Sequence, residues 1–122
     1  MANQNDTRAL AVNIAKILDT KKARDIKILR VNEKTVLADY FVIATGTSTT
    51  HVKSLADEVE YEISTKFKTE PANIEGRGLG NWTLIDYENV IVHVFNPQAK
   101  DFYNLEKLWA DCEEIEFEKT ED

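Results

Sequence analysis

An uninterrupted apolar run is the feature that most constrains the fold of this chain. Five consecutive apolar residues, Tyr40 to Ala44, follow Asp39. A strand with one face in water alternates apolar and polar residues, whereas a run of strand length without alternation is typical of a strand covered on both faces. The run is far too short to span a membrane. We therefore predict a central strand in the middle of a sheet.

Three helices are predicted around this strand. Apolar residues at helical spacing predict an amphipathic helix in residues 1–20 and a stronger one from Val52 to Phe67. The turn Gly46–Ser48 leads into the second helix, which Ser48 or Thr49 is expected to cap. Asn96 is expected to cap a third helix from Pro97 to Trp109.

Three further strands complete the prediction. Residues 26–31 predict a half-covered strand, and residues 82–86 and 90–95 predict a hairpin. Residues 69–80 hold three of the four glycines and one of the two prolines, and they read as a loop. The order αββαββα, without repeats or long linkers, predicts one α/β domain with a mixed sheet flanked by helices.

Size and composition agree with one domain. The 122 residues are 43% hydrophobic, enough for one core without disulfides or a structural metal. Cys112 is the only cysteine, so neither an internal disulfide nor a cysteine zinc site is expected. No basic segment leads into a hydrophobic stretch at the start, so we expect a protein that is neither secreted nor embedded in a membrane.

The charge is concentrated at one end of the chain. The net charge is -7, and residues 111–122, with seven acids and one base, carry -6 of it. This balance argues against a broad electrostatic grip on nucleic acid. The acidic end suits either a solubilising tail or contact with a basic partner, and charge alone does not separate the two.

Catalytic signals are weak. The turn Gly46–Ser48 resembles a phosphate-binding turn, but a nucleotidyltransferase also needs paired carboxylates for its metal, and Asp86 is the only acid in the hairpin strands. His51 is expected to be exposed or to cap its helix, and His93 to be a buried structural histidine. Cys112 is surrounded by acids and is a poor nucleophile. We expect no enzymatic activity, no metal and no cofactor.

Trp82 is the most suggestive binding residue. It follows a glycine-rich loop and opens a hairpin strand, so we expect it at the margin of the sheet. A tryptophan there is often an interface residue, but it also serves to pack beneath such a loop. The pattern leaves both interpretations open.

Several segments together resemble the ribosomal silencing factors, also called the Iojap-like family. The similar stretches are KKARDIKILRV, ADYFVIATGTSTTHVKSLAD, EGRGLGNWTLIDYENVIVHVF and FYNLEKLWAD, in the family's order, from Lys21 to Asp111. The resemblance implies a domain over residues 1–115 that is similar to nucleotidyltransferases without their carboxylates, followed by an acidic tail at 116–122. It also implies a non-enzymatic protein. The lack of a transit peptide in the sequence favours a bacterial cytoplasm.

The resemblance further implies a partner and a mechanism. Family members bind the large ribosomal subunit through its ribosomal protein fourteen, block joining of the small subunit, and so repress translation under nutrient limitation. The partner-binding residues implied here are Trp82 first, then Glu75, Gly76 and Asp86. Arg77, Leu79 and Tyr87 lie nearby, in or beside a loop that varies in the family.

Two rival functions remain open at the level of sequence. One is a nucleotide-binding enzyme that uses Gly46–Ser48 and Asp86 and binds a nucleoside triphosphate with magnesium. The other is a homodimer with Trp82 at its two-fold interface, which is compatible with ribosome binding if the dimer dissociates on docking.

Overall fold

The apolar run lies at the centre of the sheet, as predicted. The computed structural model describes residues 4–76, 81–98 and 111–118. All six residues of strand β2 (Tyr40–Thr45) are buried. β2 pairs in parallel with β5 (Val90–Phe95) and antiparallel with β1 (Arg24–Arg30). β2 therefore has a neighbouring strand on each side, and its side chains are covered on both faces of the sheet. This burial explains why no polar residue interrupts the run from Tyr40 to Ala44.

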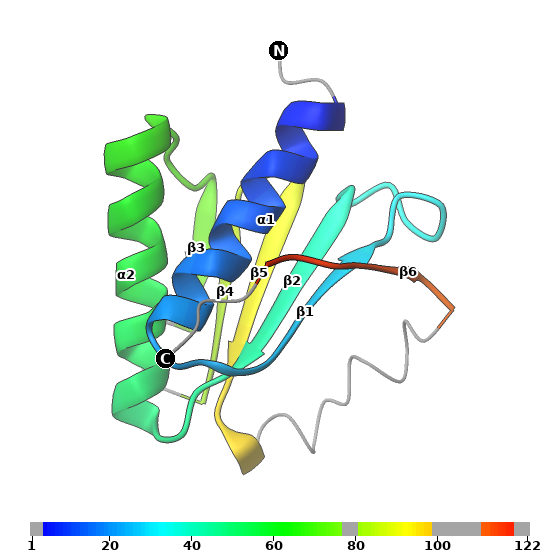
Figure 1. The fold of residues 1–122 in the computed structure, drawn as a ribbon. Coiled ribbons are helices and arrows are strands. Elements are labelled where there is room, and N and C mark those ends of the chain that lie inside the picture. The colour runs from blue at the N-terminus through cyan, green and yellow to red at the C-terminus, as the bar shows by residue number, and fades with distance from the viewer. Residues whose placement is uncertain (1–3, 77–80, 99–110, 119–122) are drawn as a thin grey trace.

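The six strands form one mixed sheet in the order β3-β4-β5-β2-β1-β6 (Figure 1). β4 (Trp82–Asp86) and β5 form the predicted hairpin, and its turn places Glu88 at a φ of 72°. β3 (Asn73–Glu75) and β6 (Glu113–Ile115) are short strands at the two edges. The predicted class, a mixed sheet with helices packed on it, is confirmed.

Neither edge strand was predicted from the sequence. β3 lies inside the segment 69–80, which was predicted as a loop, so that prediction is wrong at 73–75. A strand of three residues offers too little alternation to detect, and β3 forms because Ile74 packs on the core and pairs with Ile85. Within the described residues, β3 pairs with Leu84, Ile85 and Asp86 of β4, whereas Trp82, at the start of β4, pairs with Phe95 of β5. Residues 97–98 are helical, and the rest of the predicted third helix lies outside the described residues.

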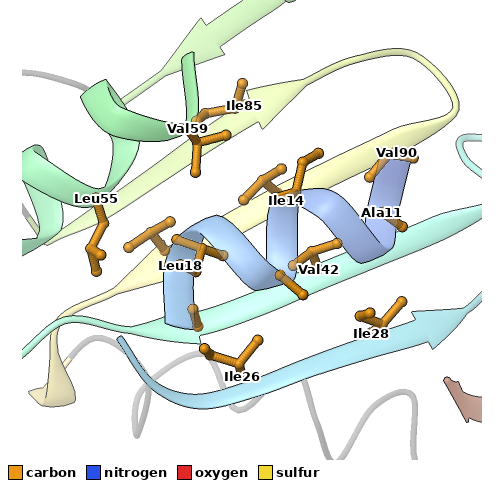
Figure 2. Close-up of a cluster of buried hydrophobic side chains, with 14 of the residues drawn as sticks. Ala11, Ile14, Leu18, Ile26, Ile28, Val42, Leu55, Val59, Ile85 and Val90 are labelled. Atoms are coloured by element: carbon orange, nitrogen blue, oxygen red, sulfur yellow. The ribbon is translucent and has the colours of Figure 1, made fainter. Parts of the chain in front are cut away.

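Helices α1 (Gln4–Thr20) and α2 (Thr49–Phe67) cover the same face of the sheet (Figure 1). Their apolar stripes meet β-branched side chains of the sheet in the main core (Figure 2). Ile14, Leu18 and Leu55 are fully buried there. Full burial of such side chains typically stabilises a fold by about 1.5–3 kcal/mol each. Within the described residues, no helix is both long and apolar enough to cross a bilayer.

A second, smaller cluster lies on the opposite face of the sheet. It contains Leu29, Val31, Ala38, Phe41, Ile43 and Phe95, with Trp82, Ile91 and Cys112 packed against it. We call this side the second face. At the end of the chain, Phe117 is partly buried against the main core, although it lies in the range predicted as an acidic tail. The boundary at residue 115 stays a prediction.

The N-terminus of α2 provides a test of the local fold. Ser48 is the N-cap, as predicted, and its Oγ accepts a hydrogen bond of 3.1 Å from the His51 backbone N–H. Ser48→Ala is expected to lower the free energy of unfolding by about 1 kcal/mol, because it removes the acceptor of a helix-terminal N–H group. Chemical denaturation measures the change. Ser54→Ala, at an exposed position inside the same helix, should be neutral or slightly stabilising, and equal losses in both variants would contradict the capping role.

Candidate partner-binding surface

Strand alternation places two of the candidate residues, Trp82 and Asp86, on the second face. Along β4, Trp82, Leu84 and Asp86 alternate with the buried Thr83 and Ile85, and Ile85 belongs to the main core under the helices. Trp82 and Asp86 therefore share the other side of the strand. They are four residues apart, which corresponds to about 13 Å along a strand.

Cross-strand pairing adds Glu75 to this side. Glu75 is paired with Leu84, and paired residues in a sheet project to the same face. Its carboxylate accepts a hydrogen bond of 3.0 Å from the Asn73 side chain. Asp86 Oδ1 accepts a hydrogen bond of 2.7 Å from the Glu88 backbone N–H, which helps to shape the hairpin turn. The structure thus brings Glu75, Trp82 and Asp86 to one face, with the two acids on adjacent strands.

Gly76 fits a position that only glycine tolerates. Its φ is +77°, and a Cβ atom built there would lie 2.1 Å from the Trp82 carbonyl oxygen. Glycine therefore permits the end of β3 to pass close to the start of β4. Gly76 contributes to the surface by setting the backbone beside Trp82 and not by offering a side chain.

Trp82 is held in a group of aromatic rings. Its indole lies nearly parallel to the Phe95 ring, with centroids 5.6 Å apart and an interplanar angle of 12°. The indole Nε1–H donates a hydrogen bond of 3.3 Å to Nδ1 of His93. The side chain is only partly buried. The indole therefore packs in part on the second face and is in part open to solvent. Its role at an interface stays a prediction, and packing beneath the loop concerns residues 77–80, which lie outside the described residues.

His93 is a buried structural histidine, as predicted. It is 5% exposed, and the Phe41 ring contacts it edge-on at a centroid distance of 4.9 Å. Burial lowers the pKa of His93 to about 4, because the charged imidazolium would lose its hydration. At neutral pH the ring is therefore uncharged.

Tyr87 does not join the surface. It is 6% exposed and belongs to the main core, on the helix side of the sheet. Burial raises the pKa of its phenol, and the negative charges of Glu60 and Glu70 raise it further. Its proximity to Asp86 in sequence is misleading, since adjacent residues of an extended chain project to opposite faces. Arg77 and Leu79 lie outside the described residues.

The structure separates the parts that a nucleotide site would need. The Gly46 N–H donates a hydrogen bond of 2.7 Å to the Phe95 carbonyl, at one end of β5. Asp86 pairs with Ile91, which is four residues from Phe95 and therefore about 13 Å away along the same strand. A polar pocket of about 550 Å³ lies near the turn, and Asp19 is the one acid among its lining residues. In the described part of the chain, no three histidine, cysteine or acidic residues are grouped as a metal site would require.

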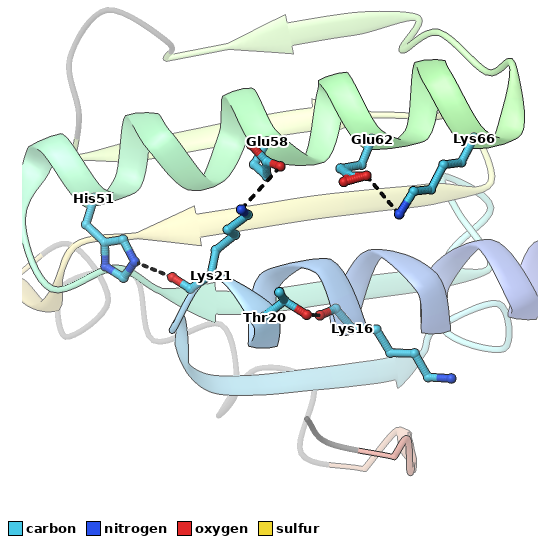
Figure 3. A network of polar contacts seen from close by, with 7 residues as sticks. All are labelled: Lys16, Thr20, Lys21, His51, Glu58, Glu62 and Lys66. Carbon is cyan, nitrogen blue, oxygen red and sulfur yellow. Dashed lines mark hydrogen bonds and ion pairs between the residues drawn. The ribbon is translucent and has the colours of Figure 1, made fainter. Parts of the chain in front are cut away.

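His51 has a structural role at that turn (Figure 3). Its Nδ1 accepts a hydrogen bond of 2.9 Å from the Thr47 backbone N–H, and its Nε2 lies 2.9 Å from the Lys21 carbonyl oxygen. Nearby, the Lys21 ammonium pairs with Glu58 at 3.5 Å. The imidazole therefore connects the start of α2 to the end of α1, which goes beyond the exposed or capping role that the sequence suggested.

Comparison with known proteins decides the family. The model of the family "Ribosomal silencing factor during starvation" matches residues 4–122. The chain belongs to the ribosomal silencing factor family. Among curated relatives, a ribosomal silencing factor of Halalkalibacterium halodurans is 36% identical over 118 residues, which cover 97% of each chain. A mouse protein named for mitochondrial assembly of the ribosomal large subunit is 33% identical over 80% of this chain and 43% of its own length.

A solved structure supports the fold assignment. A crystal structure of a Chromobacterium violaceum protein superimposes with a TM-score of 0.78 at 30% sequence identity, and the match covers 89% of this chain and 88% of the other. The family predicted from the four sequence stretches between Lys21 and Asp111 is therefore confirmed. Sequence reasoning missed the support that Phe95 and His93 give to Trp82, because pattern alone does not specify which residues of two strands are paired.

Proposed function

We propose that this protein binds the large ribosomal subunit and thereby blocks joining of the small subunit. Family membership supports a role in silencing ribosomes, and the name of the mouse relative refers to the large subunit. The proposed contact on the ribosome is ribosomal protein fourteen of the large subunit, on the face where the small subunit docks. The protein would act in a bacterial cytoplasm by occupying space, without catalysis.

The observation that carries this proposal is the position of Trp82. Its partly buried indole rests on Phe95 and shares one face of the sheet with Glu75 and Asp86. Tryptophans that are rigidly supported and partly exposed are often the residues that contribute most to binding energy. The two acids place negative charge on the same side of β3 and β4 as Trp82, which suits the basic surface expected of a ribosomal protein and favours fast association.

The steric mechanism follows from size. A specific interface buries about 800 Å² on each partner, a small part of the surface of a 122-residue domain. The rest of the domain then projects from the large subunit where the small subunit would dock. Occupancy depends on affinity relative to the concentration of free large subunits.

The test is co-sedimentation with purified ribosomal subunits on sucrose gradients. Trp82→Ala is expected to weaken binding to the large subunit at least tenfold and to restore subunit joining, because the main apolar contact is lost. Tyr61→Ala is the matched control, since Tyr61 is an exposed aromatic residue of α2 with 66% of its surface accessible. It should bind as the wild type does.

Circular dichroism and thermal unfolding must show that Trp82→Ala is folded, because the ring also packs on Phe95. If the wild type binds neither subunit, or if both variants bind equally well, the proposal is wrong. Magnesium-dependent binding of a nucleoside triphosphate by the wild type would then favour the enzymatic alternative. Analytical ultracentrifugation of the free protein would reveal the homodimer.

A further inference from the structure

We propose that His93 is a positioning residue that fixes the orientation in which Trp82 docks on its partner. This inference rests on the proposed function, in which Trp82 is the main contact with the large subunit. His93 itself is 5% exposed, so any effect it has on binding must pass through other side chains. The contact that transmits the effect is the hydrogen bond from Trp82 Nε1 to His93 Nδ1.

The hydrogen bond defines the state of the imidazole. An indole N–H is only a donor, so Nδ1 of His93 must be an acceptor and the proton of the neutral ring must reside on Nε2. A protonated ring would carry hydrogen on both nitrogens and would have no acceptor for Trp82. The buried environment favours the neutral ring that this bond requires.

The bond supplies a direction that ring packing lacks. Trp82 and Phe95 lie nearly parallel at 5.6 Å, and contact of that kind tolerates rotation of the indole within its plane and a flip of the ring. A hydrogen bond is directional and specifies which edge of the indole points toward His93. The opposite edge of the indole is then presented in one orientation, and the ordering is complete before the partner arrives.

The surroundings hold His93 in a fixed position. Its ring contacts Phe41 edge-on and lies nearly parallel to Phe95 at 6.1 Å, with an interplanar angle of 4°. In the register of β4 and β5, His93 pairs with Leu84 and Phe95 pairs with Trp82, so His93 is the diagonal neighbour of Trp82. That position is within reach of a large aromatic side chain.

Packing alone does not explain a histidine here. Nε2 is buried and has no hydrogen-bond partner in the described part of the chain. A buried polar group without a partner is destabilising, and phenylalanine would fill a similar volume without it. The feature that phenylalanine lacks is the Nδ1 acceptor, which is the atom that contacts Trp82.

Two substitutions separate the acceptor from the ring. His93→Phe keeps an aromatic ring and removes the acceptor, whereas His93→Asn places an amide oxygen near the position of Nδ1 and removes the ring. In the free protein, the indole N–H resonance of Trp82, assigned with Trp82→Phe, is expected to shift in His93→Phe and to stay close to the wild-type position in His93→Asn. This signal reports the hydrogen bond and does not depend on ribosome binding.

Affinity for the purified large subunit is the second measurement. His93→Phe is expected to bind about three- to tenfold more weakly than the wild type, as loss of one ordering hydrogen bond predicts, while unfolding at no lower temperature. His93→Asn should bind within about twofold of the wild type. In a Trp82→Phe background, which has no indole N–H, His93→Phe should change affinity less than twofold.

The results distinguish this inference from the proposed function. An unchanged indole resonance in His93→Phe, an unchanged affinity in that variant, or an equal loss of affinity in the Trp82→Phe background would each overturn the role of His93 alone. If the wild type itself does not bind the large subunit, the proposed function fails and the docking role of His93 fails with it.

Discussion

A Gly76→Ala variant is expected to lose about 3 kcal/mol or more of its unfolding free energy. The alanine would have to keep a φ near +77°, in the left-handed region that costs an L-residue about 1–2 kcal/mol. Its Cβ would also lie 2.1 Å from the Trp82 carbonyl oxygen. No side-chain rotation relieves overlap with a backbone atom, so β3 and β4 must move apart, and overpacking of this kind adds about 1–3 kcal/mol.

Thermal and chemical unfolding measure the loss, which should lower the melting temperature by about 10 °C in a domain of this size. Lys68→Gly is the control, because it introduces a glycine at a positive φ where Gly76→Ala removes one. Lys68 caps the C-terminus of α2 at a φ of 54°, a conformation that favours glycine. That variant should lose no stability. A Gly76→Ala protein as stable as the wild type would show that the close approach of the two strands is not needed.

Acidification is expected to destabilise the protein through His93. The pKa of His93 is about 4 in the folded state, against an ordinary value near 6.5. The unfolded state therefore binds more protons between pH 6.5 and 4. The contribution of His93 to stability is full above pH 6.5 and is lost as the pH falls toward 4. The loss amounts to about 2 kcal/mol by pH 5 and approaches about 3 kcal/mol at lower pH.

The measurement is the free energy of unfolding by urea from pH 7.5 to pH 5. His93→Phe removes the titrating group and nothing else that ionises, so the difference between the wild type and this variant isolates the histidine. The difference should change by about 2 kcal/mol across this range, in favour of the variant at low pH. Parallel pH profiles for the two proteins would show that His93 is not the group responsible.

Both predictions concern the support of one side chain. Gly76 lies against the backbone of Trp82, and His93 and Phe95 hold its indole. Each support has a separate physical cause: a permitted backbone conformation, a directional hydrogen bond, and ring packing. Gly76→Ala and His93→Phe should therefore reduce binding to the large subunit without removing any atom of Trp82.

Local patterns predicted the main elements correctly. The apolar run at Tyr40–Ala44 indicated the central strand, and the helical spacing from Val52 to Phe67 indicated α2. Both signals are strong. Every residue of the run is buried and therefore apolar, and in the helix the buried, apolar residues recur every third or fourth position. The short strand Asn73–Glu75 gave no such signal, since its pairing with β4 and the contact of Ile74 with the core determine it.

The sequence by itself determined the type of fold and the family, and it singled out Trp82 as the first candidate for binding, because residue spacing and short motifs are local properties of the chain. Tertiary structure alone decided which neighbours act together. Asp86, the last residue of β4, lies on the second face, whereas Tyr87, directly after it, is buried in the main core. The pairing of β4 with β5 brought His93 beside Trp82. Strand register depends on contacts between distant segments, and a change of one residue in register would reverse every face.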